Sequence, residues 1–148
     1  VVVLAELYDA TPAAAFSATT PRLINVSVRK QIDAGATLIA GFVVGGQTAR
    51  TVLVRAIGPG LAAFGVPGTM PDPRLALFDA SAQIAANDDW GGDAQIAATS
   101  ASVGAFSLPG PTSKDAVLLL TLSPGSYTAQ VSGTGGGGSA LVEVYEIP

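Results

Sequence analysis

The chain has 148 residues, of which 49% are hydrophobic and 12% are charged, and its formal net charge is −4. This length predicts a single domain with one sizeable core, and the 18 glycines and 10 prolines favour frequent turns over long helices. The acidic balance leaves no basic patch for a phosphate backbone, which argues against nucleic acid as a partner. Apolar runs stay far below the roughly 20 residues that a membrane helix needs, so we expect no transmembrane segment.

The sequence contains no histidine and no cysteine. Their absence removes the common catalytic triads, thiol chemistry, disulfides and His-based metal sites. There is also no GxSxG elbow and no Walker loop. We therefore predict no catalytic residues, no enzymatic activity and no required cofactor. The sequence begins at Val1 with neither Met nor a basic n-region, so we expect a processed or excised chain.

The first stretch, residues 2–9, reads VVLAELYD and is a near-copy of the last, residues 139–147, which reads SALVEVYEI. Both contain a Leu, a Glu two residues later and a Tyr two residues after that. Apolar runs of this kind, rich in β-branched and aromatic residues, predict buried strands. One compact domain normally needs a single closing strand, so the second copy at the start favours assembly over chemistry.

Residues 10–22 follow this strand and read ATPAAAFSATTPR. A stretch poor in charge and rich in Ala, Thr, Ser and Pro is typical of a linker. These residues, fully extended, span at most about 45 Å, so the first strand can leave its own domain. We therefore predict an N-terminal donor strand over residues 1–9, a linker over residues 10–22 and a β-sandwich domain over residues 23–148.

The rest of the chain consists of short strands separated by turns. Residues 24–29 alternate apolar and polar, as a half-buried strand does, and Gly45-Gly46-Gln47 indicates a hairpin between its flanking strands. One helical pattern spans residues 95–106, with Asp93 as its N-cap. About nine short strands and at most one short helix predict an all-β antiparallel sandwich of jelly-roll or Ig-like form. The predicted strands cover residues 2–9, 24–29, 37–44, 50–57, 74–78, 84–86, 116–122, 126–132 and 139–147.

Three motifs stand in the second half: DPRLALFD at residues 72–79, NDD at 87–89 and the hairpin-like PGSYTAQVSG at 124–133. Together they resemble the bacterial pre-peptidase C-terminal (PPC) domain, a β-sandwich appended to secreted proteases and other exoenzymes. Over residues 22–146 the chain also resembles a domain that recurs in tandem in large secreted or surface bacterial proteins. The resemblance implies an extracellular or cell-surface location. These are turn and core motifs, which specify a fold and say little about chemistry.

Acidic and amide side chains gather between residues 79 and 93. Hard oxygen ligands on a Gly-rich loop suit Ca²⁺, which takes roughly six to eight oxygens, although the spacing is not that of an EF-hand. Alternatively, these side chains cap local backbone amides in Asx turns. The candidate calcium ligands are Asp79, Asn87, Asp88, Asp89 and Asp93.

Three weaker signals have structural alternatives. Residues 58–63, GPGLAA, imitate a dinucleotide fingerprint, but Pro59 removes an amide and βαβ alternation is lacking, so we interpret them as a structural loop. Trp90 is either a sugar-stacking platform or a lid on the core. Glu6 and Glu143 either face solvent or pair across an interface with one of the arginines at positions 29, 50 and 55.

The repeated strand leads to our main hypothesis, an extracellular structural protein whose partner is another copy of itself. The N-terminal strand adds to a neighbouring sheet through backbone hydrogen bonds, and a head-to-tail contact that does not close gives a filament or a tandem surface array. The alternative is a PPC-like accessory module that binds a substrate or a carbohydrate. The predicted assembly strand comprises Val2, Leu4, Glu6, Leu7 and Tyr8, and the predicted receiving edge comprises Leu141, Glu143 and Tyr145.

Overall fold

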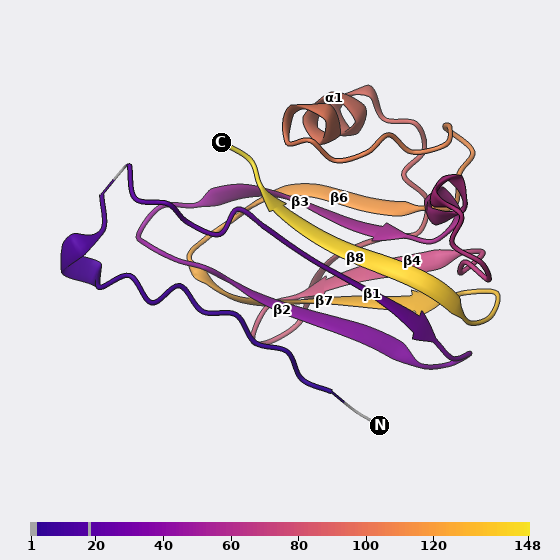
Figure 1. Ribbon diagram of the computed structural model, residues 1–148, viewed down its shortest axis with the longest axis horizontal. Helices are drawn as coiled ribbons and strands as arrows, with labels where there is room; N and C mark the ends of the chain where they lie inside the picture. Colours follow the sequence, from indigo (N-terminus) through magenta and orange to yellow (C-terminus); the bar gives the residue numbers. More distant parts are fainter. Residues whose placement is uncertain (1–2, 18) are drawn as a thin grey trace.

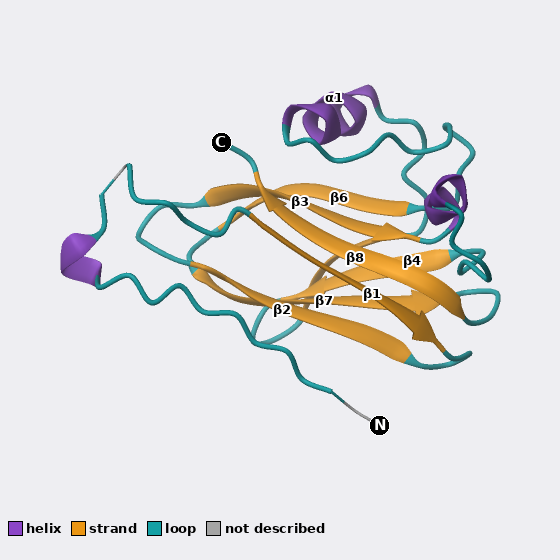
Figure 2. Cartoon of the chain, viewed as in Figure 1, coloured by secondary structure: helices purple, strands orange, loops and turns teal. Residues whose placement is uncertain are grey.

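The computed structural model describes residues 3–17 and 19–148. Within these ranges the chain forms eight strands in two four-stranded antiparallel sheets, which pack face to face as a β-sandwich (Figure 1, Figure 2). The all-β sandwich predicted from the sequence is thereby confirmed. The strands are β1 (Asn25–Ile32), β2 (Thr37–Val44), β3 (Arg50–Ile57), β4 (Pro73–Phe78), β5 (Gln83–Asn87), β6 (Ala116–Leu122), β7 (Gly125–Gly133) and β8 (Gly138–Glu146).

Sheet 1 has the strand order β1-β8-β3-β6, and sheet 2 has the order β2-β7-β4-β5. Among the described strands, β4 and β5 are the one consecutive pair within a sheet, and every other connection crosses between the sheets. The Gly45-Gly46-Gln47 turn thus leads from β2 to β3 in the other sheet, and the Pro124-Gly125 turn leads from β6 to β7 likewise. The hairpin predicted at Gly45-Gly46-Gln47 is wrong, because a turn motif reverses the chain without specifying which sheet the next strand enters.

The core lies between the sheets and is built from alternate residues of each strand. On β3, Val52, Val54 and Ala56 face inward and are buried. They lie in one layer with Val142 and Val144 of the neighbouring β8, because residues directly across an antiparallel pair share a face. The remaining buried core residues are Ile32, Leu38, Val44, Met70, Leu75, Leu77, Ala116, Leu122, Ala129, Val131 and Ala140.

The outer face of sheet 1 is covered as well. Leu53, Ile57 and Val117 alternate with the inward residues of β3 and β6, yet all three are buried. The covering segments come from two connections: the 3-10 helix η2 (Pro59–Phe64) after β3, and the helix α1 (Ala94–Ser102) before β6 (Figure 1). Part of sheet 1 is therefore packed on both faces, so its outward side chains are shielded from solvent.

Helix α1 begins where the sequence predicts. The Asp93 carboxylate accepts hydrogen bonds from the amides of Gln95 and Ile96 at 2.7 and 3.0 Å, which caps two free N–H groups of the first turn. The predicted extension to residue 106 is wrong: the helix stops at Ser102, and Gly104 then takes a left-handed φ of +74°. Among the described helices, none is both long and apolar enough to cross a membrane.

The sequence predicts about nine strands, and the one that is missing is the first. From residue 3 to residue 10 the backbone pairs with no other strand of the chain, and Val2 lies outside the described residues. A β-strand is defined by the neighbour that shares its hydrogen bonds. The single chain offers this segment no such neighbour, so the apolar pattern is present without the strand.

Candidate assembly site

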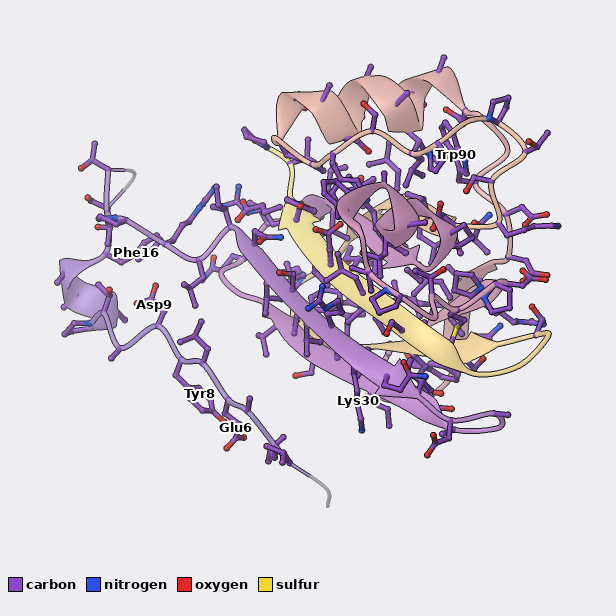
Figure 3. All side chains as sticks on the ribbon, turned by 45° about the vertical axis from the view of Figure 1, so that its right-hand side comes forward. Glu6, Tyr8, Asp9, Phe16, Lys30 and Trp90 are labelled. Atoms are coloured by element: carbon purple, nitrogen blue, oxygen red, sulfur yellow. The ribbon has the colours of Figure 1, made fainter. Side chains whose placement is uncertain are left out.

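The N-terminal segment, which we define as residues 3–9, runs outside the sandwich (Figure 1, Figure 3). Its large apolar side chains are almost fully in solvent: Val3 is 79% exposed, Leu4 80%, Leu7 69% and Tyr8 77%. A short 3-10 helix, η1 (Ala13–Ala15), interrupts the linker before the chain enters β1. Exposed apolar stretches of this kind are typical of interaction surfaces, which makes the segment a candidate site.

The N-terminal segment resembles β8 in side-chain arrangement as well as in sequence. The Tyr8 hydroxyl donates to Oε1 of Glu6 at 2.9 Å, and the Tyr145 hydroxyl donates to Oε1 of Glu143 at the same distance. Residues two apart share one face of an extended chain. The N-terminal segment therefore already presents the same polar pair that β8 presents on the outer face of sheet 1.

The predicted receiving edge is wrong in its position. Leu141, Glu143 and Tyr145 lie on β8, which is hydrogen-bonded to β1 on one side and to β3 on the other. A strand paired on both sides has no backbone groups left for a third. The free edges of the two sheets are β1 and β6 in sheet 1 and β2 and β5 in sheet 2. Which strands have a free edge depends on the strand order, and the hydrophobic pattern of the sequence does not encode that order.

Glu143 has its partner within the chain rather than across an interface. Its Oε2 lies 3.3 Å from Nε of Arg55 on the neighbouring strand, and both side chains are buried. The guanidinium also stacks on the Phe106 ring, 4.5 Å from its centroid. Burial, with the hydrogen bond to Glu143, raises the pKa of Tyr145 to about 12. This network ties β3, β8 and the segment after α1 together.

The GPGLAA loop is structural, as we interpreted it. The buried Asp115 carboxylate accepts hydrogen bonds from the amides of Gly58 and Gly60, so these groups are not free for a phosphate. A Cβ on Gly58 would lie 2.2 Å from the Met70 carbonyl oxygen, a distance that no side chain can occupy. The glycines allow close packing here, and Asp115 holds the loop in place.

The acidic side chains at positions 79 and 93 bind local backbone. Asp79 accepts from the amides of Ser81 and Ala82 at 2.8 and 2.9 Å, which is the Asx-turn arrangement. These bonds stabilise the ionised form and lower the pKa of Asp79. Asp93 is the cap of α1 described above. Each carboxylate thus already has one oxygen engaged in a local turn.

The middle of the acidic loop is likewise engaged in contacts of its own. The Asn87 side-chain oxygen accepts from the amide of Val117 at 2.9 Å, and Asp89 pairs with Lys114 at 2.7 Å. Asp88 is exposed. Within residues 3–17 and 19–148, no three acidic side chains converge as a metal-ligand group would. Calcium binding at these five residues stays a prediction, and the geometry is that of the Asx-turn alternative.

An apolar groove lies on the outer face of sheet 1 beside β1. It is open to solvent, with a volume of about 400 Å³. Phe64 and Phe106 meet edge to face in its wall, with ring centroids 4.7 Å apart. Sequence reasoning missed this groove, because its only signal is a set of scattered apolar residues in two loops. Its lining residues are Ser27, Arg29, Leu61, Phe64, Val66, Phe106 and Leu141.

Trp90 does not lie in this groove. Its indole Nε1 donates to the Gly110 carbonyl at 2.9 Å and its backbone amide donates to the Asp115 carbonyl at 2.8 Å. The ring is half-buried, which fits the lid interpretation better than a free sugar platform.

No protein-family model matches the sequence, and no curated protein does. Among solved structures, the chain is similar to the crystal structure of the pre-peptidase C-terminal domain of a collagenase from Bacillus anthracis, with 14% sequence identity and a TM-score of 0.49. The match covers 82% of this chain and 89% of that one. At this level of similarity the comparison carries no argument about function. Occurrence in a tandem array or in a large secreted protein stays a prediction.

Proposed function

We propose that the chain is an extracellular structural subunit whose N-terminal segment completes a sheet of a neighbouring sandwich, so that subunits join head to tail. The observation that supports this most strongly is a strand-like, solvent-exposed apolar segment attached to a body that already contains its own closing strand, β8. Strand addition supplies the backbone hydrogen bonds that the segment lacks in one chain. It also removes an exposed aggregation-prone stretch from water.

The apolar side chains make such a contact favourable. Fully burying a Leu or Val side chain contributes roughly 1.5–3 kcal/mol, and Val3, Leu4 and Leu7 are all exposed in the single chain. Loss of translational freedom and ordering of the segment oppose this gain. Several buried side chains together with a ladder of backbone bonds therefore decide the affinity, rather than any one contact.

The linker ends where the body holds it. Arg22 donates to Oε1 of Glu146 at 2.7 Å, and the amide of Glu146 donates to the Ile24 carbonyl at 2.8 Å. These contacts tie the start of β1 to the end of β8. The stretch that precedes them is free to extend by up to about 45 Å, which is enough to reach a second molecule.

The outer groove favours a second candidate, a binding module that takes an apolar or carbohydrate ligand. Phe64 is 60% exposed in the groove wall, and Arg29 supplies a cation at its margin. An aromatic face beside a polar group is a common arrangement in ligand sites. The resemblance of residues 72–79, 87–89 and 124–133 to PPC motifs supports a role outside the cell for either candidate. Under both we expect no hydrolytic turnover, because the chain lacks His, Cys and a nucleophile motif.

Deleting residues 1–9 tests the main proposal. We expect the full chain to form concentration-dependent oligomers in light scattering and filaments or strings in electron microscopy, and the shortened chain to remain a folded monomer. The matched variants Leu4→Asp and Leu7→Asp should block assembly without changing the melting temperature, because a charge buried in the seam costs several kcal/mol. Leu23→Asp, exposed but outside the segment, is the control. Unimpaired assembly of the shortened chain would refute the proposal.

A further inference from the structure

We propose that the free edge of β1 is the surface that receives the N-terminal segment of a second copy. This inference rests on the proposed function and adds the place, the orientation and the charge pairing of the contact. It replaces β8, which has no free edge. The sheet formed between two copies would then have the order segment-β1-β8-β3-β6.

The sandwich is open along β1. Val26 and Val28 lie opposite Val144 and Val142 of β8, so they face the core, because paired residues share a face of the sheet. Yet each is 42% exposed, whereas their β8 partners are buried. A core-facing valine left uncovered at a sheet edge is what an added strand would bury.

The other edges lack this feature. On β6, the opposite edge of sheet 1, the core-facing Ala116 and Leu122 are buried and the two leucines between them are partly buried. On β2, the core-facing Leu38 and Val44 are buried. The fourth edge, β5, is five residues long and bulged where it meets β4. Among the described edges, exposed core-facing apolar side chains are thus concentrated on β1.

The two faces of the segment match those of the edge. Val3, Ala5 and Leu7 alternate with Leu4, Glu6 and Tyr8, so over residues 3–8 one face is apolar and the other carries the polar pair. Asp9 follows at the end of the apolar face. β1 already pairs antiparallel with β8, which carries the same pattern. An antiparallel segment on the free side of β1 would place its apolar face beside the two uncovered valines and its polar pair on the outer face of sheet 1.

The charges are complementary. Arg29 and Lys30 are exposed on β1, and among the described residues neither forms an ion pair. Glu6 and Asp9 of the segment are exposed and likewise unpaired. A lysine on an edge strand, such as Lys30 on β1, disfavours pairing with an uncharged strand. The β1 edge therefore favours the acidic N-terminal segment over apolar strands without charge.

The similarity of the N-terminal segment to β8 also predicts the register in which the segment pairs with β1. Ser27 of β1 lies opposite Glu143 of β8, and Arg29 lies opposite Leu141. If the segment repeats this register on the free side, Glu6 lies opposite Ser27, and Leu4 lies opposite Arg29 at the margin of the outer groove. A shift by one residue would turn the apolar face outward, so the faces allow only this register or one shifted by an even number of residues.

Engineered disulfides test the docking site directly, because the chain has no cysteine of its own. Full-length Glu6→Cys protein is mixed with full-length Ser27→Cys protein under oxidation, and the mixed dimer is identified by mass. Thr121→Cys on β6 and Val43→Cys on β2, both exposed, are the matched acceptor controls. We expect the mixed dimer with Ser27→Cys in large excess over either control. A dominant mixed dimer at position 121 or 43 would overturn the inference while leaving the proposed function intact.

Charge reversal provides the second arm. In this register Glu6 lies diagonally across from Arg29 on the outer face, within reach of its long side chain. Arg29→Glu and Glu6→Lys should each raise the concentration needed for half-assembly about fivefold, the effect of one exposed ion pair. Mixing the two variants should restore a Glu–Lys pair at one of the junctions. Arg74→Glu, exposed on β4, is the control. If Arg29→Glu leaves assembly unchanged while deletion of residues 1–9 abolishes it, the segment docks elsewhere. If the deletion also has no effect, the proposed function fails with the inference.

Discussion

Arg55 and Glu143 form an ion pair in the interior, with Nε and Oε2 3.3 Å apart on the neighbouring strands β3 and β8. None of the three guanidinium nitrogens of Arg55 has a hydrogen-bond partner among the described residues, and the Phe106 ring covers the group. Desolvation lowers the pKa of Arg55, and the nearby carboxylate opposes this effect. A pair desolvated to this degree holds its strands in register, yet each member depends on the other.

Breaking that pair from one side should destabilise the fold strongly. Glu143→Gln leaves a buried guanidinium without its counter-charge, so we expect a loss of about 3–5 kcal/mol in the free energy of unfolding. The double variant Arg55→Met with Glu143→Leu should recover most of this loss, because it removes both charges together. Urea denaturation of the single variants Arg55→Met and Glu143→Leu and of the double variant measures the coupling. Additive losses in the double variant would mean that the two side chains act independently.

Alkaline pH should weaken the same region. Burial and the hydrogen bond to Glu143 raise the pKa of Tyr145 to about 12, above its ordinary value near 10. A raised folded-state pKa contributes stability that is present in full below about pH 10 and is lost as the pH rises through 12. The melting temperature should therefore fall less steeply between pH 9 and 12 in Tyr145→Phe than in the natural chain. If the melting temperatures of the two proteins fall equally with pH, the alkaline loss of stability comes from groups other than Tyr145.

Gly58 should tolerate no side chain. A Cβ there would lie 2.2 Å from the Met70 carbonyl oxygen, so Gly58→Ala must displace backbone and should cost about 1–3 kcal/mol. Gly45→Ala is the matched control, because nothing lies within 4 Å of its added Cβ. Chemical denaturation of both variants measures the difference. Equal stability would show that the loop after β3 moves freely to make room.

Asp93 distinguishes the turn-capping interpretation of the acidic loop from calcium binding. As an N-cap it should contribute about 1 kcal/mol, so Asp93→Ala should lower the melting temperature equally in Ca²⁺ and in chelator. We expect no calcium dependence in the natural chain, since a ligand bound only by the folded state would raise its stability. A melting temperature that rises with Ca²⁺, and that loses this response in Asp93→Ala, would favour the metal instead.

Much of the fold could be predicted from local pattern. Alternation located the eight strands of the body to within a few residues, and the spacing of Asp93 from the apolar residues after it located the start of α1. The pairing of strands could not be predicted in this way. Gly45 and Gly46 indicate a reversal, but the buried faces of β2 and β3 decide that they enter different sheets. Such faces meet only after the whole chain has folded.

The candidate site, too, could be predicted from the sequence only in part. The likeness of residues 3–9 to β8 is visible in the sequence and extends to the Tyr8–Glu6 hydrogen bond. The free edge of β1 is not visible, because Val26 and Val28 read as ordinary core residues until their 42% exposure is known. The groove was missed for a related reason: Phe64 and Phe106 are far apart in sequence and meet through loops that have no periodic pattern.

Hydrogen exchange of the N-terminal segment is the most direct test of strand addition. In the single chain the amides of residues 3–8 bond to no other strand, so they should exchange freely when the protein is dilute. Above the assembly concentration, alternate amides should become protected to the degree of β1, because a sheet neighbour then accepts their hydrogen bonds. Mass spectrometry of the N-terminal peptide measures this at both concentrations. Free exchange in fully assembled protein would contradict the account.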